Sequence, residues 1–422
     1  RSVNLINDRG IHICKSMLAY QKFGNGETPE SSGKKGDHLV GDYYVRYNEW
    51  ARDDETAEEQ AREMLRAWEA GEPETVELWK KMNAWVFDGV KQTYEATGVH
   101  FDALYFESET YTSGKEEILR GVEEGVFYRE EDGSVWVDLE PIGLDKKILL
   151  RSDGTSVYVT QDIGTVLARY ADVPFDRMIY VVGSEQIYHF QVLFQVLKLL
   201  GYPWAAQLFH LSYGMVNLPE GKMKSREGTV VDADVLLAEL GELARQEIVE
   251  KERESEIDDV EATAAAIALG ALHYYLLQVS PSKDMVFNPR ESLAFTGNTG
   301  PYLQYVCARI NSILRKANES GRTASEGVDG AALASEAEWG LIRRIAAFPA
   351  VIERAGADYS PSLIAGHLYE VAREFSSFYH DHPVLNAEHQ SERGARLALC
   401  RAVLVVLRNG MRLLNIPYLS KM

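Results

Sequence analysis

The segment RMIYVVGSEQIYHFQVLFQVLKLLG, from Arg177 to Gly201, decides the fold class. It begins with a short apolar run that contains β-branched and aromatic residues, which is typical of a buried strand. A turn at Gly183 follows, and then apolar residues recur at helical spacing until Gly201, a residue type that commonly ends a helix. A strand followed directly by a helix is the repeating unit of an α/β fold with a parallel sheet.

The flanking sequence repeats this alternation. VNLINDRG reads as a strand and a turn, with a helix from about Ile11 to Phe23. Residues 146–172 predict a strand, a turn at Asp153-Gly154 and a helix that starts near Ser156. Residues 126–139 predict a β-hairpin, and residues 53–77 predict one solvated helix. From about Asp232 onward the apolar pattern is helical, which predicts an all-α bundle in the C-terminal third.

Composition excludes several classes of protein. The chain has 422 residues, 45% of them hydrophobic and 26% charged, which is ordinary for globular domains. The sequence contains no run of 18 apolar residues, so we expect no membrane-spanning helix. Cys14, Cys307 and Cys400 are far apart, which disfavours a disulfide framework or a zinc site made of close cysteine pairs. We expect a reducing, cytoplasmic location.

The charge is unevenly distributed. The formal net charge is −20, yet residues 301–422 carry 14 Lys and Arg against 12 Asp and Glu. An acidic protein repels a polyanion such as RNA, so any RNA contact needs local basic surface. The C-terminal part is the better candidate for such a surface.

A basic loop is the first candidate site. GKMKSREGTVV, Gly221 to Val231, places three cations between two glycines. An apolar stretch precedes it, and a helix follows, with Asp232 or Asp234 as its predicted cap. A basic loop between a strand and a helix can neutralise a leaving pyrophosphate, although short basic turns are also common on surfaces.

Two further candidates follow predicted strands. Tyr158 and Asp162 are four residues apart, so they share one helix face. Such a pair can hold a cationic side chain, with the carboxylate on a guanidinium and the ring over its plane; the alternative is a helix cap and a core residue. Gln186 and His189 follow the next strand, where open α/β sheets bind ligands. His380, His382 and His389 have poor spacing for a metal site, and we expect no bound metal.

At this point several segments resemble one family in the same order along the chain. GKMKSREGT is similar to the KMSKS loop of class I aminoacyl-tRNA synthetases, in the form found in arginyl-tRNA synthetases. The other similar segments are NDRGIHICKSMLAY, GDYYVRY, LLRSDGTSVYVTQDIG, YVVGSEQIYHFQVLF, NTGPYLQYVCARI and the ending MRLLNIPYLSKM.

The resemblance implies a Rossmann-like parallel-sheet catalytic domain over residues 1–240 with a connective insertion at about 25–145. A helical connector over 241–285 and a helical anticodon-binding domain over 286–422 would follow. The substrates would be arginine, ATP with Mg²⁺, and the tRNA for arginine, and we expect a monomer.

The resemblance also implies roles for particular residues. Arginine would contact Tyr158, Asp162 and Gln186. The catalytic cations would be Lys222, Lys224 and Arg226. ATP would contact His189, Met215, Met223 and Ser225. Transfer RNA would contact Tyr302, Arg309, Arg401, Arg408 and Arg412, of which the last three recur at helical spacing.

Two departures from the family pattern bear on these expectations. The His-x-Gly-His hallmark is absent from the sequence, which suggests the C-terminal part of a longer enzyme, inactive by itself. Lys224 and Arg226 stand where the loop of the family has serines. Because the similar segments occur in the same order along the chain, the main hypothesis is still an arginyl-tRNA synthetase. The alternatives are a non-catalytic tRNA-binding fragment or paralogue, and a nucleotidyl transferase acting on another small cation.

Overall fold

The computed structural model describes residues 1–217, 232–250, 257–321 and 330–422. The described chain forms two compact units, one from Arg1 to Ser212 and one that holds the described residues from Tyr213 onward. The basic loop lies outside the described residues, and with it the predicted contacts of Lys222, Met223, Lys224, Ser225 and Arg226.

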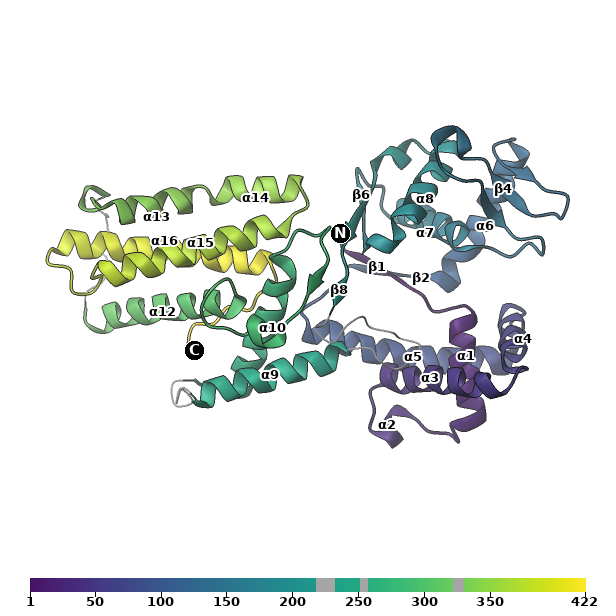
Figure 1. The fold of residues 1–422 in the computed structure, drawn as a ribbon, viewed down its shortest axis with the longest axis horizontal. Coiled ribbons are helices and arrows are strands. Elements are labelled where there is room, and N and C mark those ends of the chain that lie inside the picture. Colours follow the sequence, from purple (N-terminus) through teal and green to yellow (C-terminus); the bar gives the residue numbers. More distant parts are fainter. Residues whose placement is uncertain (218–231, 251–256, 322–329) are drawn as a thin grey trace. The chain divides into compact units, whose positions relative to one another are not determined.

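The first unit alternates short strands with helices (Figure 1). Its elements are β1 (Val3–Ile6), α1 (Ile11–Phe23), α2 (Pro29–Ser32), α3 (Gly36–Asp53), α4 (Ala57–Glu69), α5 (Pro73–Ala96), β2 (Ala103–Phe106), α6 (Glu107–Glu123), β3 (Tyr128–Arg129), β4 (Val135–Val137), η1 (Glu140–Ile142), β5 (Lys147–Leu150), α7 (Tyr158–Asp172), β6 (Met178–Gly183), η2 (Ser184–Gln186), α8 (Ile187–Leu199), η3 (Pro203–Gln207) and β7 (Leu208–Tyr213). The predicted strand–helix pairs are confirmed, and α1 has the predicted bounds.

The strands of this unit form small sheets. β1 and β2 pair in parallel, with Val3 opposite Ala103. β3, β4 and β5 form an antiparallel sheet, which confirms the predicted hairpin. β6 pairs with β7. Among the described residues the α/β fold therefore has small sheets of two or three short strands in place of one continuous sheet.

Helices α1 to α5 form the long connection between β1 and β2. They enclose a core of their own, which includes Met17, Leu39, Tyr47 and Met82. The prediction of one helix over residues 53–77 is wrong, because the chain makes α4 and then starts α5 at Pro73. Gly71 between them has φ 74°, a left-handed conformation that glycine adopts without strain. Proline then occupies the first turn of α5, where no amide hydrogen is needed.

A second core of the first unit lies between α6, α7, α8 and the β3–β4–β5 sheet. Ile118, Leu149, Ile163, Leu193 and Val196 are fully buried in it. This core fixes the first turns of α7 and α8, where the predicted arginine-binding residues lie.

The second unit is almost entirely helical. Its elements are β8 (Val216–Asn217), α9 (Ala233–Glu250), α10 (Val260–Leu277), β9 (Met285–Val286), α11 (Pro289–Ser292), α12 (Gly300–Glu319), η6 (Gly330–Ala332), α13 (Glu336–Ala346), α14 (Phe348–Ala357), α15 (Pro361–Asp381) and α16 (Gln390–Leu413). Of the two predicted caps of α9, Asp232 is the one used, since its Oδ1 accepts from the N–H of Asp234 at 2.7 Å. The predicted helical bundle is confirmed.

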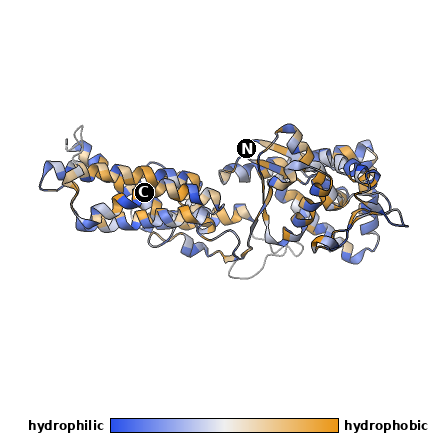
Figure 2. Cartoon of the chain, turned by 90° about the horizontal axis from the view of Figure 1, so that it is seen from above, coloured by the Kyte–Doolittle hydropathy of each residue, from blue (hydrophilic) through white to orange (hydrophobic). Residues whose placement is uncertain are grey.

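The bundle packs its apolar faces inward, and orange and blue residues alternate along its helices in Figure 2. Leu303, Val306, Leu368, Phe375 and Leu407 from α12, α15 and α16 are fully buried. α10 is the one described helix long and apolar enough to cross a membrane by length and composition. It lies against α9 and α12 and buries Ile267 and Tyr274, and a core helix of this kind passes the same test.

Candidate functional site

Two glycines let α6 and α7 cross with their backbones in contact. A Cβ at Gly114 would lie 1.8 Å from the Thr160 carbonyl oxygen, and one at Gly164 would lie 2.1 Å from that of Thr110. The hydroxyls of Thr110 and Thr165 share a hydrogen bond of 2.9 Å at the same crossing. The close approach brings the first turn of α6, which begins at Glu107, next to the second turn of α7, which contains Asp162 and Gly164.

The predicted residues Asp162 and His189 meet at this place. Asp162 Oδ2 on α7 and His189 Nε2 on α8 are 2.6 Å apart, and both side chains are about a quarter exposed. The imidazole therefore orients the carboxylate while leaving part of it accessible. Tyr158 is 71% exposed at the start of α7, and Gln186 is exposed just before α8.

A second carboxylate, Glu107, was missed by the sequence reasoning. It begins α6 directly after β2, is only 6% exposed, and accepts a hydrogen bond from Asn7 Nδ2 at 2.9 Å. Asn7 follows β1 in the same way. The sequence shows a polar residue after each of these segments, but only the structure shows that β1 and β2 pair in parallel, which places the two residues side by side at one sheet edge.

The surroundings of Glu107 disfavour its charge. Burial is the largest cause that raises the pKa of this carboxyl above its ordinary value, and the negative charges of Asp162 and Asp8 raise it further. The hydrogen bond from Asn7 and the cation of Arg9 act in the opposite direction. Two neighbouring carboxylates, one buried and one accessible, favour binding of a cationic group.

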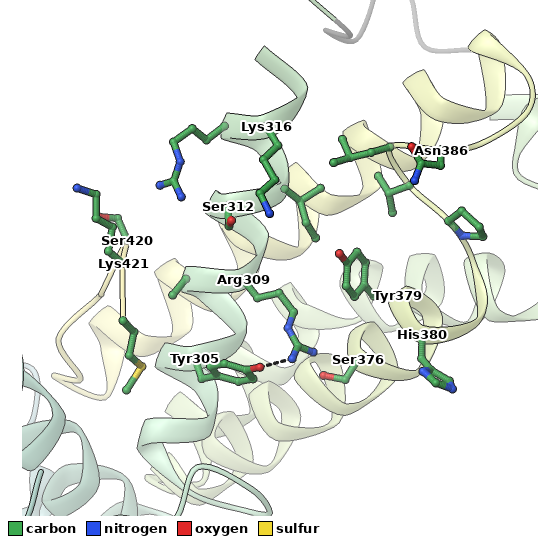
Figure 3. A pocket seen from close by; sticks show the side chains of 17 residues that line it. Tyr305, Arg309, Ser312, Lys316, Ser376, Tyr379, His380, Asn386, Ser420 and Lys421 are labelled. Atoms are coloured by element: carbon green, nitrogen blue, oxygen red, sulfur yellow. Dashed lines mark hydrogen bonds between the residues drawn. The ribbon is translucent and has the colours of Figure 1, made fainter. Parts of the chain in front are cut away.

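The second unit contains a large hollow on the bundle (Figure 3). Its volume is about 1200 Å³. Its lining includes Tyr305, Arg309 and Lys316 from α12, Tyr379 from α15, and Lys421 near the C-terminus. These side chains reach the hollow from segments far apart in the sequence.

Aromatic rings and cations dominate this hollow. The guanidinium carbon of Arg309 lies 4.6 Å from the ring centre of Tyr305 and 5.9 Å from that of Tyr379, and Arg309 donates to the Tyr305 hydroxyl. The lining holds four Lys and Arg, namely Arg309, Arg315, Lys316 and Lys421, and neither Asp nor Glu. Rings beside cations suit the flat, apolar faces of a nucleobase and a nearby phosphate.

The remaining predicted tRNA contacts lie apart from the hollow. Tyr302 packs against Tyr369, and its hydroxyl is 3.0 Å from Ser376 Oγ. The tyrosine that α12 contributes to the lining is Tyr305, three residues after Tyr302. Its spacing of four residues from Arg309, which puts both on one helix face, could have indicated this from the sequence. Arg401, Arg408 and Arg412 are all exposed on α16, as one basic face requires.

Met215, the last predicted ATP contact in the described chain, lies in the second unit. It is 39% exposed between β7 and β8, and its N–H donates to Asp284 Oδ1 at 2.7 Å.

Comparison with known proteins defines the class to which this fold and site belong. A family model described as "tRNA synthetases class I (R), catalytic domain" matches residues 4–289, and one described as "DALR anticodon binding domain" matches residues 303–422. The chain thus has the domain pair of a class I aminoacyl-tRNA synthetase. A relative named Arginine--tRNA ligase in Treponema denticola is 58% identical, over 100% of this chain and 72% of the relative. The chain belongs to the arginyl-tRNA synthetase family.

Further similarities agree with this assignment. A protein of the same name in Bacteroides thetaiotaomicron is 53% identical over 99% of this chain and 73% of the relative. The arginyl-tRNA synthetase structure from Thermus thermophilus superimposes with a TM-score of 0.85 at 26% identity, covering 100% of this chain and 75% of that one. A methionyl-tRNA synthetase of Mycobacterium tuberculosis, solved with methionyl-adenylate, shares the fold at a TM-score of 0.61 and 14% identity over 98% of this chain and 91% of its own.

Membership of this family identifies the reaction. Its members are arginine–tRNA ligases, which use ATP to activate arginine and join it to tRNA. The non-catalytic alternative is therefore not favoured.

Proposed function

We propose that the first turn of α6 and the first two turns of α7 form the arginine pocket of this chain. Asp162 accepts the guanidinium of the substrate, His189 orients that carboxylate, and Glu107 supplies the second negative charge. Tyr158 covers the planar group, and Gln186 adds a hydrogen bond. The observation that carries this proposal is the accessible Asp162 carboxylate, held 2.6 Å from His189 beside the buried Glu107.

We propose that ATP binds as its Mg²⁺ complex, as phosphoryl-transfer chemistry generally requires. Lys222, Lys224 and Arg226 would neutralise charge on the leaving pyrophosphate, with Met223 and Ser225 in the same loop. His189 and Met215 would contact the nucleotide. This assignment rests on the loop sequence and on membership of the family.

We propose that the hollow in the second unit binds an unstacked base of the tRNA against its aromatic lining. The guanidinium of Arg309, which lies beside the rings of both Tyr305 and Tyr379, and Lys316 would then lie near the phosphates. The aromatic and basic lining supports this role. The exposed arginines of α16 would extend the basic surface. The predicted domain bounds, a monomeric state and a cytoplasmic location complete the proposal.

The arginine pocket is tested by Asp162→Asn, which keeps the shape of the side chain and removes its charge. Removing one partner of a buried charge pair costs about 3–5 kcal/mol, which corresponds to roughly a 10²- to 10³-fold weaker binding of arginine. Arginine affinity is measured by titration calorimetry on the purified protein, and kcat/KM for arginine by an arginylation assay.

The matched control is Asp172→Asn at the opposite end of the same helix, where the carboxylate pairs with Arg1 and is half exposed. This change should leave arginine affinity unaltered. Retention of arginine affinity within about threefold in Asp162→Asn would place the substrate elsewhere.

A further inference from the structure

Arg9 is a buried cation that has no role in the proposed arginine, ATP or tRNA sites. Its side chain is 7% exposed, and its Nη2 lies 2.7 Å from Glu69 Oε1 on α4. The guanidinium carbon lies 3.9 Å from the ring centre of Tyr111 on α6 and 5.4 Å from that of Trp68 on α4. A planar group held in this way has little freedom to turn.

The other end of the guanidinium reaches the arginine pocket. With the Gln161 amide oriented to satisfy both neighbours, its oxygen accepts from Arg9 Nη1 at 3.1 Å and its nitrogen donates to Glu107 Oε1. Gln161 directly precedes Asp162 on α7. A continuous chain of polar contacts therefore runs from Glu69 through Arg9 and Gln161 to Glu107.

Charge gives this chain a consequence beyond packing. Glu107 faces Asp8 from the segment after β1, Asp162 from α7 and the cation of Arg9, while Glu69 from α4 pairs with that cation. Arg9 lowers the pKa of Glu107, in opposition to burial and to the two aspartates. Without this cation, the pocket would lose part of its negative charge at a higher pH.

We propose that Arg9 is a positioning residue for the arginine pocket: it holds Gln161 and the Glu107 carboxylate beside Asp162 and ties them to helix α4. The proposal rests on the proposed function of this pocket. Arg9 itself does not touch the substrate. It acts by favouring the ionised form of Glu107 and by fixing the position of its carboxyl group, so that the pocket presents two acidic groups to a guanidinium.

The experiment compares arginine affinity in Arg9→Gln, Arg9→Lys and the unchanged chain by calorimetry at about pH 6 and pH 8.5. In Arg9→Gln, each unit by which the pKa of Glu107 rises costs up to about tenfold in affinity below that pKa. We therefore expect a loss of about tenfold or more at the lower pH and a smaller loss at the higher pH. The contact between His189 and Asp162 is the same in every variant. A difference in pH dependence between the variants therefore measures the contribution of Glu107.

Arg9→Lys restores the charge without the planar fork, and should return the pH profile toward that of the unchanged chain. In a Glu107→Gln background, Arg9→Gln should add no further pH dependence. Arg66→Gln, an exposed arginine of α4 paired with Glu59, is the matched control and should change neither affinity nor profile.

A loss that is equal at both pH values, or one that Arg9→Lys fails to restore, would show that Arg9 only packs α4 against α6 and would overturn the proposal. Failure of the pocket itself gives a different result, because Asp162→Asn would then leave arginine binding unchanged. If Arg9→Gln does not fold, Arg9→Lys measured with and without Glu107→Gln still decides, because a change in the pH profile that persists without the Glu107 carboxylate would overturn the proposal.

Discussion

At the scale of the residue, Glu338 and Arg396 show how strongly one buried ion pair ties the bundle together. Arg396 Nε lies 2.7 Å from Glu338 Oε1, and both side chains are less than a tenth exposed. Burial alone would raise the pKa of Glu338, but Arg396 and the hydrogen bonds from Ser335 hold it below its ordinary value. Glu338→Gln should lower the free energy of unfolding by about 3 kcal/mol at neutral pH, because the guanidinium stays buried with only Glu392 as its acid.

The pH dependence of that loss has a definite sign. A carboxyl with a lowered pKa stabilises the fold above its unfolded pKa, and this contribution is lost as pH falls through the folded pKa. The difference between Glu338→Gln and the unchanged chain, measured by urea unfolding, should therefore shrink in acid below about pH 4. Asp358→Asn breaks an exposed pair with Arg354 and should cost less than about 1 kcal/mol. Equal costs for the two variants would contradict this account.

At the scale of the element, the α6–α7 crossing depends on glycine. Alanine is better than glycine in a free helix by about 1 kcal/mol, but a Cβ at Gly164 would lie 2.1 Å from the Thr110 carbonyl oxygen. Gly164→Ala should therefore destabilise the first unit by about 1–3 kcal/mol and weaken arginine binding, since the helices that carry Glu107 and Asp162 must separate. Gly241→Ala on α9 meets nothing within 4 Å and should stabilise slightly. Urea unfolding and calorimetry measure both effects, and a more stable Gly164→Ala chain would refute the argument.

The sequence predicted individual helices and strands better than it predicted contacts between distant residues. The bounds of α1, the strand–helix pairs around Tyr158 and His189, and the bundle follow from local spacing, and the structure confirms them. The resemblance placed Asp162 and His189 in one site, but local spacing does not predict their contact, because β5 and β6, which precede them, lie in different sheets. Arg9 and Glu107 could not be distinguished from other polar residues by sequence alone, since their importance comes from contacts with residues 60 and 100 positions away. The hollow of the bundle likewise joins α12, α15 and the C-terminus, a juxtaposition that no periodicity encodes.

At the scale of the whole molecule, charge distinguishes the region proposed to bind RNA from the rest of the chain. The net charge is −20, and residues 301–422 contribute +2, so residues 1–300 together carry −22. Affinity for tRNA must therefore come from few local cations acting against a repulsive background. The four cations of the hollow and the arginines of α16 are the groups placed to supply it.

The salt dependence of tRNA binding should separate these groups by role. Each phosphate contact contributes about 0.7–0.9 to the slope of log affinity against log salt concentration, so Lys316→Gln should lower the slope by roughly that amount. Tyr379→Ala removes a stacking surface, which is worth about 1–3 kcal/mol per base, and should weaken binding without changing the slope. Arg354→Gln, an exposed cation on α14 outside the lining of the hollow, should change neither quantity. Filter binding or fluorescence anisotropy over a range of salt concentrations measures both. If Lys316→Gln and Arg354→Gln lowered the slope equally, the cations would act only as diffuse charge, and the hollow would not be where the tRNA backbone lies.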